Sequence, residues 1–241
     1  MTGSAARLSV SGWIALAAAL GLALGALLGW VAFAPRHPGD DSADAGFARD
    51  MSEHHAQAVE MSLLVMQRTD DPDVVRLASD IATSQAYQQG QMGTWLVEWG
   101  LPQARPRERM AWMADHDHTT MDAPDGVPMP GMATAAEIAK LTASKGKAAE
   151  VLYLQLMTTH HLAGVEMARA GLDLGRDAQV RSLAEKMVRA QSGEVELMTS
   201  MLAERGSQPR EDVSAIIGSG SPSASTPAEG SSTMGGGHSS H

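Results

Sequence analysis

The sequence contains no cysteine, and this absence excludes disulfides, thiolate catalysis and thiolate metal sites together. Aromatic residues are also scarce, with two Phe, two Tyr and five Trp among 241 residues. Basic residues are fewer than acidic ones, 18 against 28, and the resulting net charge of −10 argues against a nucleic-acid partner. The composition therefore points away from redox thiol chemistry and from nucleic-acid binding.

Methionine and histidine are plentiful by contrast, with 16 Met and nine His. The methionine thioether is a soft donor that suits Cu(I), while imidazole suits copper, zinc, iron and nickel. The competing interpretation is that methionine simply fills the cores of helical proteins. Which interpretation applies depends on where these residues stand along the chain.

Residues 8–34 carry no charge and are rich in Ala, Leu and Gly. Such a run is long enough to cross a hydrocarbon core of about 30 Å as a helix. Ala32-Phe33-Ala34 resembles a cleavage site, but Pro35 directly after it disfavours cutting, and the run exceeds the apolar stretch of an ordinary signal peptide. We therefore predict that residues 1–35 are an uncleaved signal anchor in the cell membrane, with the remainder outside the cytoplasm. A secreted protein is the alternative if the anchor is cleaved.

An eleven-residue segment occurs twice, as MSEHHAQAVEM at Met51–Met61 and as MTTHHLAGVEM at Met157–Met167. The offset is 157 − 51 = 106 residues, and it continues without a gap through a second segment. The pairs at this offset include Asp71/Asp177, Gln85/Gln191, Met92/Met198 and Gly100/Gly206. An ungapped match over two helix-length segments indicates a duplicated unit.

Helix signals divide the chain further. Asp71-Pro72 and Asp177 are helix starts, Gly100 and Gly206 are stops, and Thr134 with Glu137 forms a capping box. We predict an all-α fold in which two repeated helical hairpins form a four-helix bundle behind one N-terminal transmembrane helix. The expected divisions are a linker at 36–46, the bundle at 47–206 with repeats 47–101 and 153–206, a Met/His-rich connector at 102–133, and a disordered tail at 207–241.

The paired histidines lie on the buried side of their helix. On a helical wheel, Met51, His54, His55 and Met61 share a face of about 120° with the apolar positions, and Glu53 points the other way. The second copy has the same spacing. Buried imidazoles are costly unless they are hydrogen-bonded or bound to metal. We therefore predict a metal site formed by Met51, His54, His55, Met61, Met157, His160, His161 and Met167.

The same wheel disfavours a carboxylate-bridged di-iron centre. Such centres need an inward Glu followed three residues later by His. Here the residue three after Glu60 is Leu63, and the residue three after Glu166 is Arg169.

The second helix of each repeat places a glutamine on its buried stripe. Gln85 lies there with Met92, and Gln191 with Met198. A buried amide needs a partner. The two glutamines either hold the histidines in place around a metal or form an inter-helix hydrogen bond that fixes the register of the bundle.

The connector is a candidate for an accessory metal site or for a gate over the bundle. Its potential ligands are Met113, His116, His118, Met121, Met129 and Met132. The alternative is a flexible loop that happens to be rich in methionine.

These residues resemble a known family, the bacterial proteins that carry the domain of unknown function numbered 305. The resemblance covers 47–205 and rests on four segments of this chain. They are Phe47-x₃-Met51-x₂-His54-His55-x₂-Ala58-x₂-Met61, Leu77-Ala78-x₂-Ile81-x₃-Gln85, Met129-Pro130-Gly131-Met132-Ala133, and Met157-x₂-His160-His161-x-Ala163-Gly164-x₂-Met167. The family usually has an aspartate after the connector glycine, where this chain has Ala148-Ala149-Glu150.

The resemblance implies a ferritin-like four-helix bundle that is exported or membrane-anchored, with some members linked to copper binding and copper tolerance. We therefore expect an extracytoplasmic protein that binds copper, as Cu(I) or Cu(II), for sequestration or tolerance, and not an enzyme. The alternative is a metal-free helical interaction or stress-response module with a polar histidine core. The protein partner of either is not indicated by the sequence.

Overall fold

The computed structural model describes residues 9–33, 37–104, 108–114 and 126–210. All regular secondary structure in these ranges is helical. The chain divides into two compact units, residues 1–39 and residues 40–241. The candidate ligands His116, His118 and Met121 lie outside the described residues, as does the tail beyond 210.

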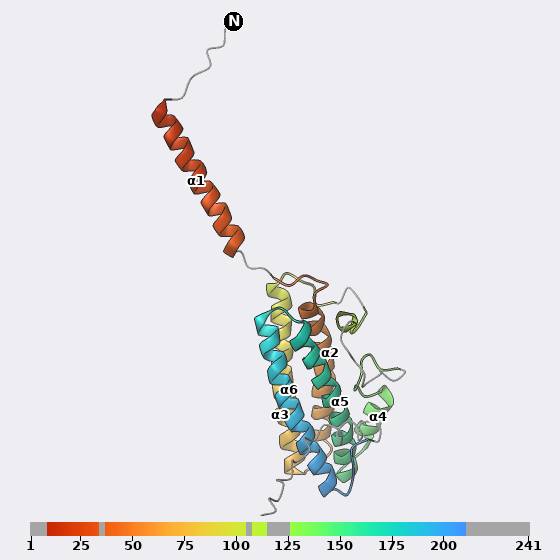
Figure 1. Ribbon diagram of the computed structural model, residues 1–241. Helices are drawn as coiled ribbons and strands as arrows, with labels where there is room; N and C mark the ends of the chain where they lie inside the picture. Colours follow the sequence, from red (N-terminus) through yellow and green to blue (C-terminus); the bar gives the residue numbers. More distant parts are fainter. Residues whose placement is uncertain (1–8, 34–36, 105–107, 115–125, 211–241) are drawn as a thin grey trace, which may run out of the picture. The chain divides into compact units, whose positions relative to one another are not determined.

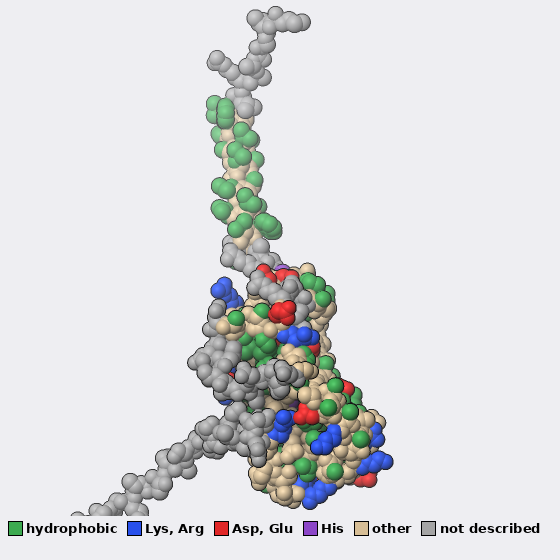
Figure 2. Space-filling model, turned by 90° about the vertical axis from the view of Figure 1, so that its right-hand side faces the viewer, with side chains coloured by type: hydrophobic (Ala, Val, Ile, Leu, Met, Phe, Trp, Pro, Cys, Tyr) green, Lys and Arg blue, Asp and Glu red, His purple; other side chains and the backbone are tan. Residues whose placement is uncertain are grey.

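The first unit contains α1, Val10–Phe33, a helix of 24 residues without a charged side chain. Its segment Val10–Val31 has a mean hydropathy of 2.2. Apolar side chains run along the helix in Figure 2. At a rise of 1.5 Å per residue the helix is about 36 Å long, which is sufficient to cross a bilayer.

The second unit is built on two helical hairpins (Figure 1). The first consists of α2, Ala43–Met66, and α3, Pro72–Glu98; the second consists of α5, Lys147–Leu174, and α6, Ala178–Glu204. The bounds of α3 and α6 differ by the repeat offset at both ends, since 178 − 72 and 204 − 98 both equal 106. Asp71 caps α3 and Asp177 caps α6, each through one carboxylate oxygen that accepts two backbone N–H groups. The sequence duplication is thus a duplication of structure.

The two hairpins meet mainly through α2 and α5, whereas the backbones of α3 and α6 approach each other less closely. The short helix α4, Ala135–Ala143, packs on α2 and α5 and begins at the capping box of Thr134 and Glu137. A single 3₁₀ turn, η1 at Ala111–Met113, packs on α2. The described part of the connector at η1 therefore lies against α2.

Asp44 and Glu150, which are also 106 residues apart, hold the two hairpins together reciprocally. Asp44 Oδ1 accepts the backbone N–H groups of Arg176 and Asp177, at 2.9 and 3.0 Å, in the α5–α6 turn. Glu150 accepts the hydroxyl of Thr69, at 2.6 Å, in the α2–α3 turn. Helix α2 starts at Ala43, inside the segment expected to be a linker, because Ser42 caps it by accepting the backbone N–H of Ala45. Glu150 is buried at the second of these contacts.

The bundle core is divided into three layers. The first apolar cluster includes Phe47, Met51, Met92, Met167 and Met187. The second apolar cluster includes Met61, Ile81, Tyr153, Met157 and Met198. Between them every long helix contributes buried polar side chains, which we call the polar layer: His54, His55, Gln85, His160, His161 and Gln191. A polar layer in the middle of a bundle core is costly unless each group is satisfied, so it is the natural place to look for a site.

Candidate metal centre

The polar layer brings the two copies of the histidine motif into direct contact. The rings of His54 and His160 stack with their centroids 3.7 Å apart and an interplanar angle of 30°. The Nε2 atom of His160 donates to the backbone carbonyl of His54 at 3.0 Å. Both side chains are buried, with exposed fractions of 0% and 1%.

The outer histidine of each pair is held by the neighbouring helix. His55 Nε2 donates to the amide oxygen of Gln88 on α3 at 2.7 Å. His161 Nε2 donates to the carboxylate of Glu194 on α6 at 2.8 Å. Gln88 and Glu194 are again 194 − 88 = 106 residues apart. The two outer histidines are therefore oriented in the same way in both repeats.

These hydrogen bonds fix which ring nitrogen carries the proton. A carbonyl or carboxylate oxygen can only accept, so the hydrogen bonds of His55, His160 and His161 require a proton on Nε2, and in a neutral ring this leaves Nδ1 unprotonated. Their Nδ1 atoms then present lone pairs to the core, and none of these atoms has a hydrogen-bond partner. The unpartnered atoms of the polar layer are Nδ1 of His55, His160 and His161, both ring nitrogens of His54, and Oε1 of Gln85 and Gln191.

Burial lowers the pKa of His54, His55 and His160 and so keeps these three imidazoles neutral. Removal from water, together with the nearby His55 and His161, lowers the pKa of His54 from 6.5 to about 3. The carbonyl of Pro130 acts in the opposite direction, but it lies outside hydrogen-bonding geometry. Burial also lowers the pKa of His55 to about 4, with the Gln88 hydrogen bond opposing it. Burial and repulsion from His54 lower the pKa of His160 well below 6.5. At neutral pH no proton therefore competes with a metal ion for the unprotonated ring nitrogens of His54, His55 and His160.

The eight predicted ligands do not form one shell. The four histidines share the polar layer, but Met51 and Met167 lie in the first apolar cluster, and Met61 and Met157 lie in the second. Met51 and Met61 are ten residues apart on one helix, a rise of about 15 Å. One ion cannot contact both. Any site must therefore combine imidazoles of the polar layer with thioethers from one side of it.

The described residues contain no cluster of three or more His, Asp or Glu side chains that could hold a metal ion. Structural zinc is almost always bound by four ligands in a tetrahedron, so the polar layer is a poor zinc site. A site with one or two imidazoles and a thioether suits a soft ion better.

Gln85 and Gln191 do not hold the outer histidines. That role belongs to Gln88 and Glu194, one helical turn further on. Gln191 is accommodated by Gly164, because a Cβ at that glycine would lie 2.2 Å from Gln191 Oε1. Met92 and Met198, expected beside these glutamines, are apolar core residues of the first and second clusters. Gln88 and Glu194 are equivalent positions of the repeat. The helical wheel selects only the fully buried stripe of each helix, and neither residue lies on it.

The described ends of the connector are bound tightly to the bundle. Asp50 accepts the backbone N–H of Met110 at 2.8 Å and the indole N–H of Trp112 at 3.0 Å. Met113, Met129 and Met132 are buried and belong to the first apolar cluster. These three accessory candidates thus pack with Met51 and Met167, while His116, His118 and Met121 lie outside the described residues.

Gly131 brings the connector against the polar layer. Its φ is 75°, and a Cβ there would lie 2.4 Å from Ala163 Cβ and 2.9 Å from the Thr159 carbonyl, with the His160 Cα 3.3 Å away. Gln57 pairs with both backbone groups of Ala133, at 2.6 and 2.9 Å. The connector end therefore forms a fixed wall beside His160.

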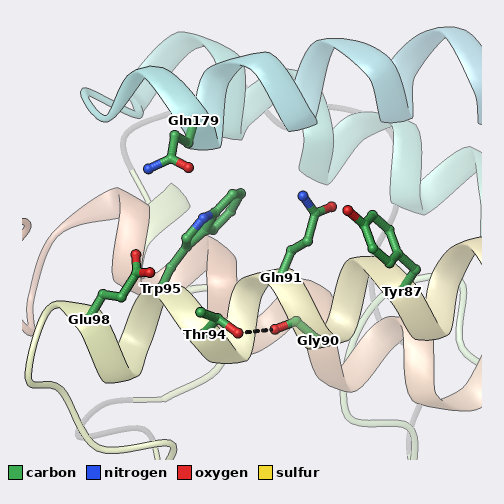
Figure 3. Close-up of a pocket in the computed structure, with 7 residues that line it drawn as sticks. All are labelled: Tyr87, Gly90, Gln91, Thr94, Trp95, Glu98 and Gln179. Atoms are coloured by element: carbon green, nitrogen blue, oxygen red, sulfur yellow. Dashed lines mark hydrogen bonds between the residues drawn. The ribbon is translucent and has the colours of Figure 1, made fainter.

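A groove of about 460 Å³ lies between α3 and α6 (Figure 3). In the figure Gln179 of α6 faces Trp95 of α3, and Thr94 donates to the Gly90 carbonyl at 2.8 Å. The remaining lining residues are Tyr87, Gln91 and Glu98. None of these is a histidine or methionine, so this groove does not share the chemistry of the polar layer.

Several proteins of known structure resemble this chain in fold. A crystallised DUF305 protein of Streptomyces coelicolor is 50% identical over 71% of this chain and 99% of that one, with a TM-score of 0.65. A DUF305 fragment of Deinococcus radiodurans is 31% identical over 70% and 99% of the two chains, with a TM-score of 0.57. The protein CopM in its Cu(I)-bound form is 20% identical over 67% and 96%, with a TM-score of 0.51, a similarity that shows the fold alone. No curated protein matches the chain.

The family profile of the domain of unknown function DUF305 matches residues 44–202, from the Asp44 clamp to the last turn of α6. This range covers both hairpins and the connector, and it is well over half of the chain. The protein therefore belongs to the DUF305 family.

Proposed function

We propose that the bundle binds copper as cargo, as Cu(I), between the imidazoles of the polar layer and the thioethers beside it. The observation that carries this proposal is the set of buried, unpartnered Nδ1 lone pairs on His55, His160 and His161. Each of these nitrogen atoms can only accept a hydrogen bond, and the protein offers it no donor. A bound cation would satisfy the lone pair in place of a donor. The bound forms of CopM, which include Cu(I) and silver complexes, support the choice of a soft ion.

Each half of the duplication supplies its own thioether. On α2, Met51 lies three residues before His54, a rise of about 4.5 Å, and on α5 Met157 lies three residues before His160 in the same way. With His55 and His161 these four residues are the ligands we propose, and each ion uses thioethers from one side only: Met51 with Met167 in the first apolar cluster, or Met157 with Met61 in the second. The buried Met113, Met129 and Met132 add thioethers on the first-cluster side.

We propose binding rather than catalysis. A metal that turns over substrate needs an open position that the substrate can reach. His54 and His160 are essentially inaccessible, with exposed fractions of 0% and 1%. A protein that holds copper for sequestration, tolerance or delivery needs no such open position, because only the ion has to enter and leave.

The proposed location is outside the cytoplasm, with α1 as anchor. The length and hydropathy of Val10–Val31 support a membrane span, and the Streptomyces relative is described as a secreted protein. Copper in that compartment would meet the bundle before reaching the cytoplasm.

The test is Cu(I) competition against a chromophoric chelator, comparing the parent chain with a variant in which His54, His55, His160 and His161 are alanine. His37→Ala serves as the control, because His37 is exposed and lies outside the bundle helices. Helicity of all three proteins is checked by circular dichroism. We expect tight binding by the parent and by the control, and loss of binding in the fourfold variant.

Two outcomes contradict the proposal in different ways. Binding that survives in the fourfold variant would move the site to the connector or the tail. Failure of the parent to bind would favour the metal-free module, in which ordered water satisfies the polar layer.

A further inference from the structure

The two halves of the polar layer are built alike but differ in charge at one position. His55 donates to a neutral amide, Gln88, whereas His161 donates to a carboxylate, Glu194, at nearly the same distance, 2.7 against 2.8 Å. The histidines themselves are equally buried, each with an exposed fraction of 0%. The duplication thus provides an internal comparison between an amide and a carboxylate at equivalent positions.

The carboxylate is close enough to the core to act on it electrically. The Glu194 side chain is 25% exposed, while that of His161 is 0% exposed. Burial is the main cause that raises the pKa of Tyr153 in the second apolar cluster, and the charge of Glu194 adds to it. A charge on a partly buried group is weakly screened, so its effect on a neighbouring site is large compared with that of a surface charge.

Among the described residues, Glu194 is the carboxylate that contacts a histidine of the polar layer. Moving an ion out of water into an apolar core is costly, and the cost falls when an opposite charge lies nearby. A carboxylate that accepts the N–H of a ligating imidazole supplies this compensation and also makes the imidazole a stronger donor. Gln88 fixes the orientation of His55 but supplies no charge.

We infer that Glu194 makes the two half-sites unequal, so that the first Cu(I) ion is held by the His161 half and a second ion binds more weakly at the His55 half. This inference rests on the proposed copper binding. Glu194 is a positioning and charge-compensating residue here, since it acts through His161. The protein should therefore bind one Cu(I) ion at a low ratio of copper to protein and two ions at a high ratio.

The experiment uses the full chain in detergent and Cu(I) alone as the probe, with two reciprocal variants. Glu194→Gln keeps the hydrogen-bond acceptor and removes the charge, which makes both halves neutral. Gln88→Glu adds a carboxylate to the His55 half. Glu185→Gln is the charge control, because Glu185 lies on the same helix and pairs with Arg189 at the surface.

Glu194→Gln should weaken the first binding step by about 10- to 100-fold, the usual effect of losing such a partner of a metal-bound histidine. Gln88→Glu should strengthen the second step toward the first. Long-range ¹H–¹⁵N spectra of the metal-free proteins should show His161 protonated at Nε2 in the parent and in Glu194→Gln, which separates loss of charge from loss of orientation.

The outcomes distinguish the two proposals. If the parent binds no Cu(I), copper binding itself is wrong and this inference falls with it. If the parent binds and Glu194→Gln binds equally well, copper binding stands and the role of Glu194 is overturned. Equal weakening by Glu185→Gln would also overturn it, because the effect would then be one of overall charge.

Discussion

The imidazole of His54 stacks on the imidazole of His160, its counterpart 106 residues later, at a centroid distance of 3.7 Å. Two equivalent residues in contact place the approximate two-fold relation between the hairpins at this point. The stack also explains why the rings must be neutral. Two imidazolium rings at this distance in an apolar core would repel each other without solvent screening.

The neutral histidines predict that acid destabilises the fold well above the range in which carboxylates protonate. The folded-state pKa values of His54 and His55 are lowered to about 3 and 4, whereas in the unfolded chain they lie near 6.5. Their stabilisation is therefore complete above pH 6.5 and is lost as the pH falls toward the folded values. At 1.4 kcal/mol per pH unit, each should cost about 2 kcal/mol of unfolding free energy at pH 5.

This pH dependence is measured by urea unfolding of metal-free protein between pH 5 and 7.5. His54→Gln removes one titrating group and should reduce the loss between pH 7 and pH 5 by about 2 kcal/mol. His37→Ala, at an exposed position, should leave the loss unchanged. Equal slopes for the parent and His54→Gln would mean that His54 is not buried in the neutral form.

Replacing Glu150 should have a large effect on stability without touching the polar layer. It accepts the Thr69 hydroxyl at 2.6 Å and Arg205 Nε at 2.8 Å, and the side chains of Glu150 and Arg205 are each 10% exposed. Glu150→Ala leaves this cation partly unpaired, although Asp71 still binds it. We expect a loss of about 3 kcal/mol.

The matched control for this change is Glu185→Ala. Its ion pair with Arg189 is exposed, with side-chain fractions of 56% and 63%, so its loss should cost less than about 0.5 kcal/mol. The two are compared by chemical denaturation at pH 7. Similar small losses would show that Glu150 does not join the hairpins.

The sequence predicts the architecture well because the signals that specify it are local. Helix periodicity, the caps at Asp71 and Asp177, and the capping box at Thr134 each depend on residues within a few positions of one another. The constant offset of the repeat then relates the hairpins. The family resemblance is confirmed by the profile and by the two DUF305 structures.

The site was harder to predict because its decisive contacts join different helices. A wheel finds that His54 faces inward, but it cannot show that His54 stacks on His160 or that His55 selects Gln88 over Gln85. Nor can it separate Met51 from Met61, which share a face but lie on opposite sides of the polar layer. The reciprocal clamps of Asp44 and Glu150 were missed for the same reason.

The apolar helix predicts membrane attachment. With α1 present, the chain should remain in the membrane fraction after alkaline extraction, whereas a fragment beginning at Asp40 should be soluble. N-terminal sequencing of the native protein tests cleavage. A mature chain that starts after Ala34 would mean secretion and would contradict the anchor.

Gly131 predicts that the connector end is fixed against α5 beside the polar layer. Alanine at this position would adopt a φ of 75° and place its Cβ 2.4 Å from Ala163 Cβ and 2.9 Å from the Thr159 carbonyl. The left-handed backbone conformation costs an alanine about 1 kcal/mol, and the two close contacts add about 2 kcal/mol through overpacking. Gly100→Ala separates the two, because Gly100 has a φ of 71° and nothing within 4 Å of the new Cβ. We therefore expect the unfolding free energy to fall by about 3 kcal/mol for Gly131→Ala and about 1 kcal/mol for Gly100→Ala.

Because Thr159 directly precedes His160, Gly131→Ala should also weaken Cu(I) binding while Gly100→Ala leaves it intact. Equal losses of stability would show that the connector does not rest on α5, and the wall beside His160 would then have to be formed by the bundle helices alone.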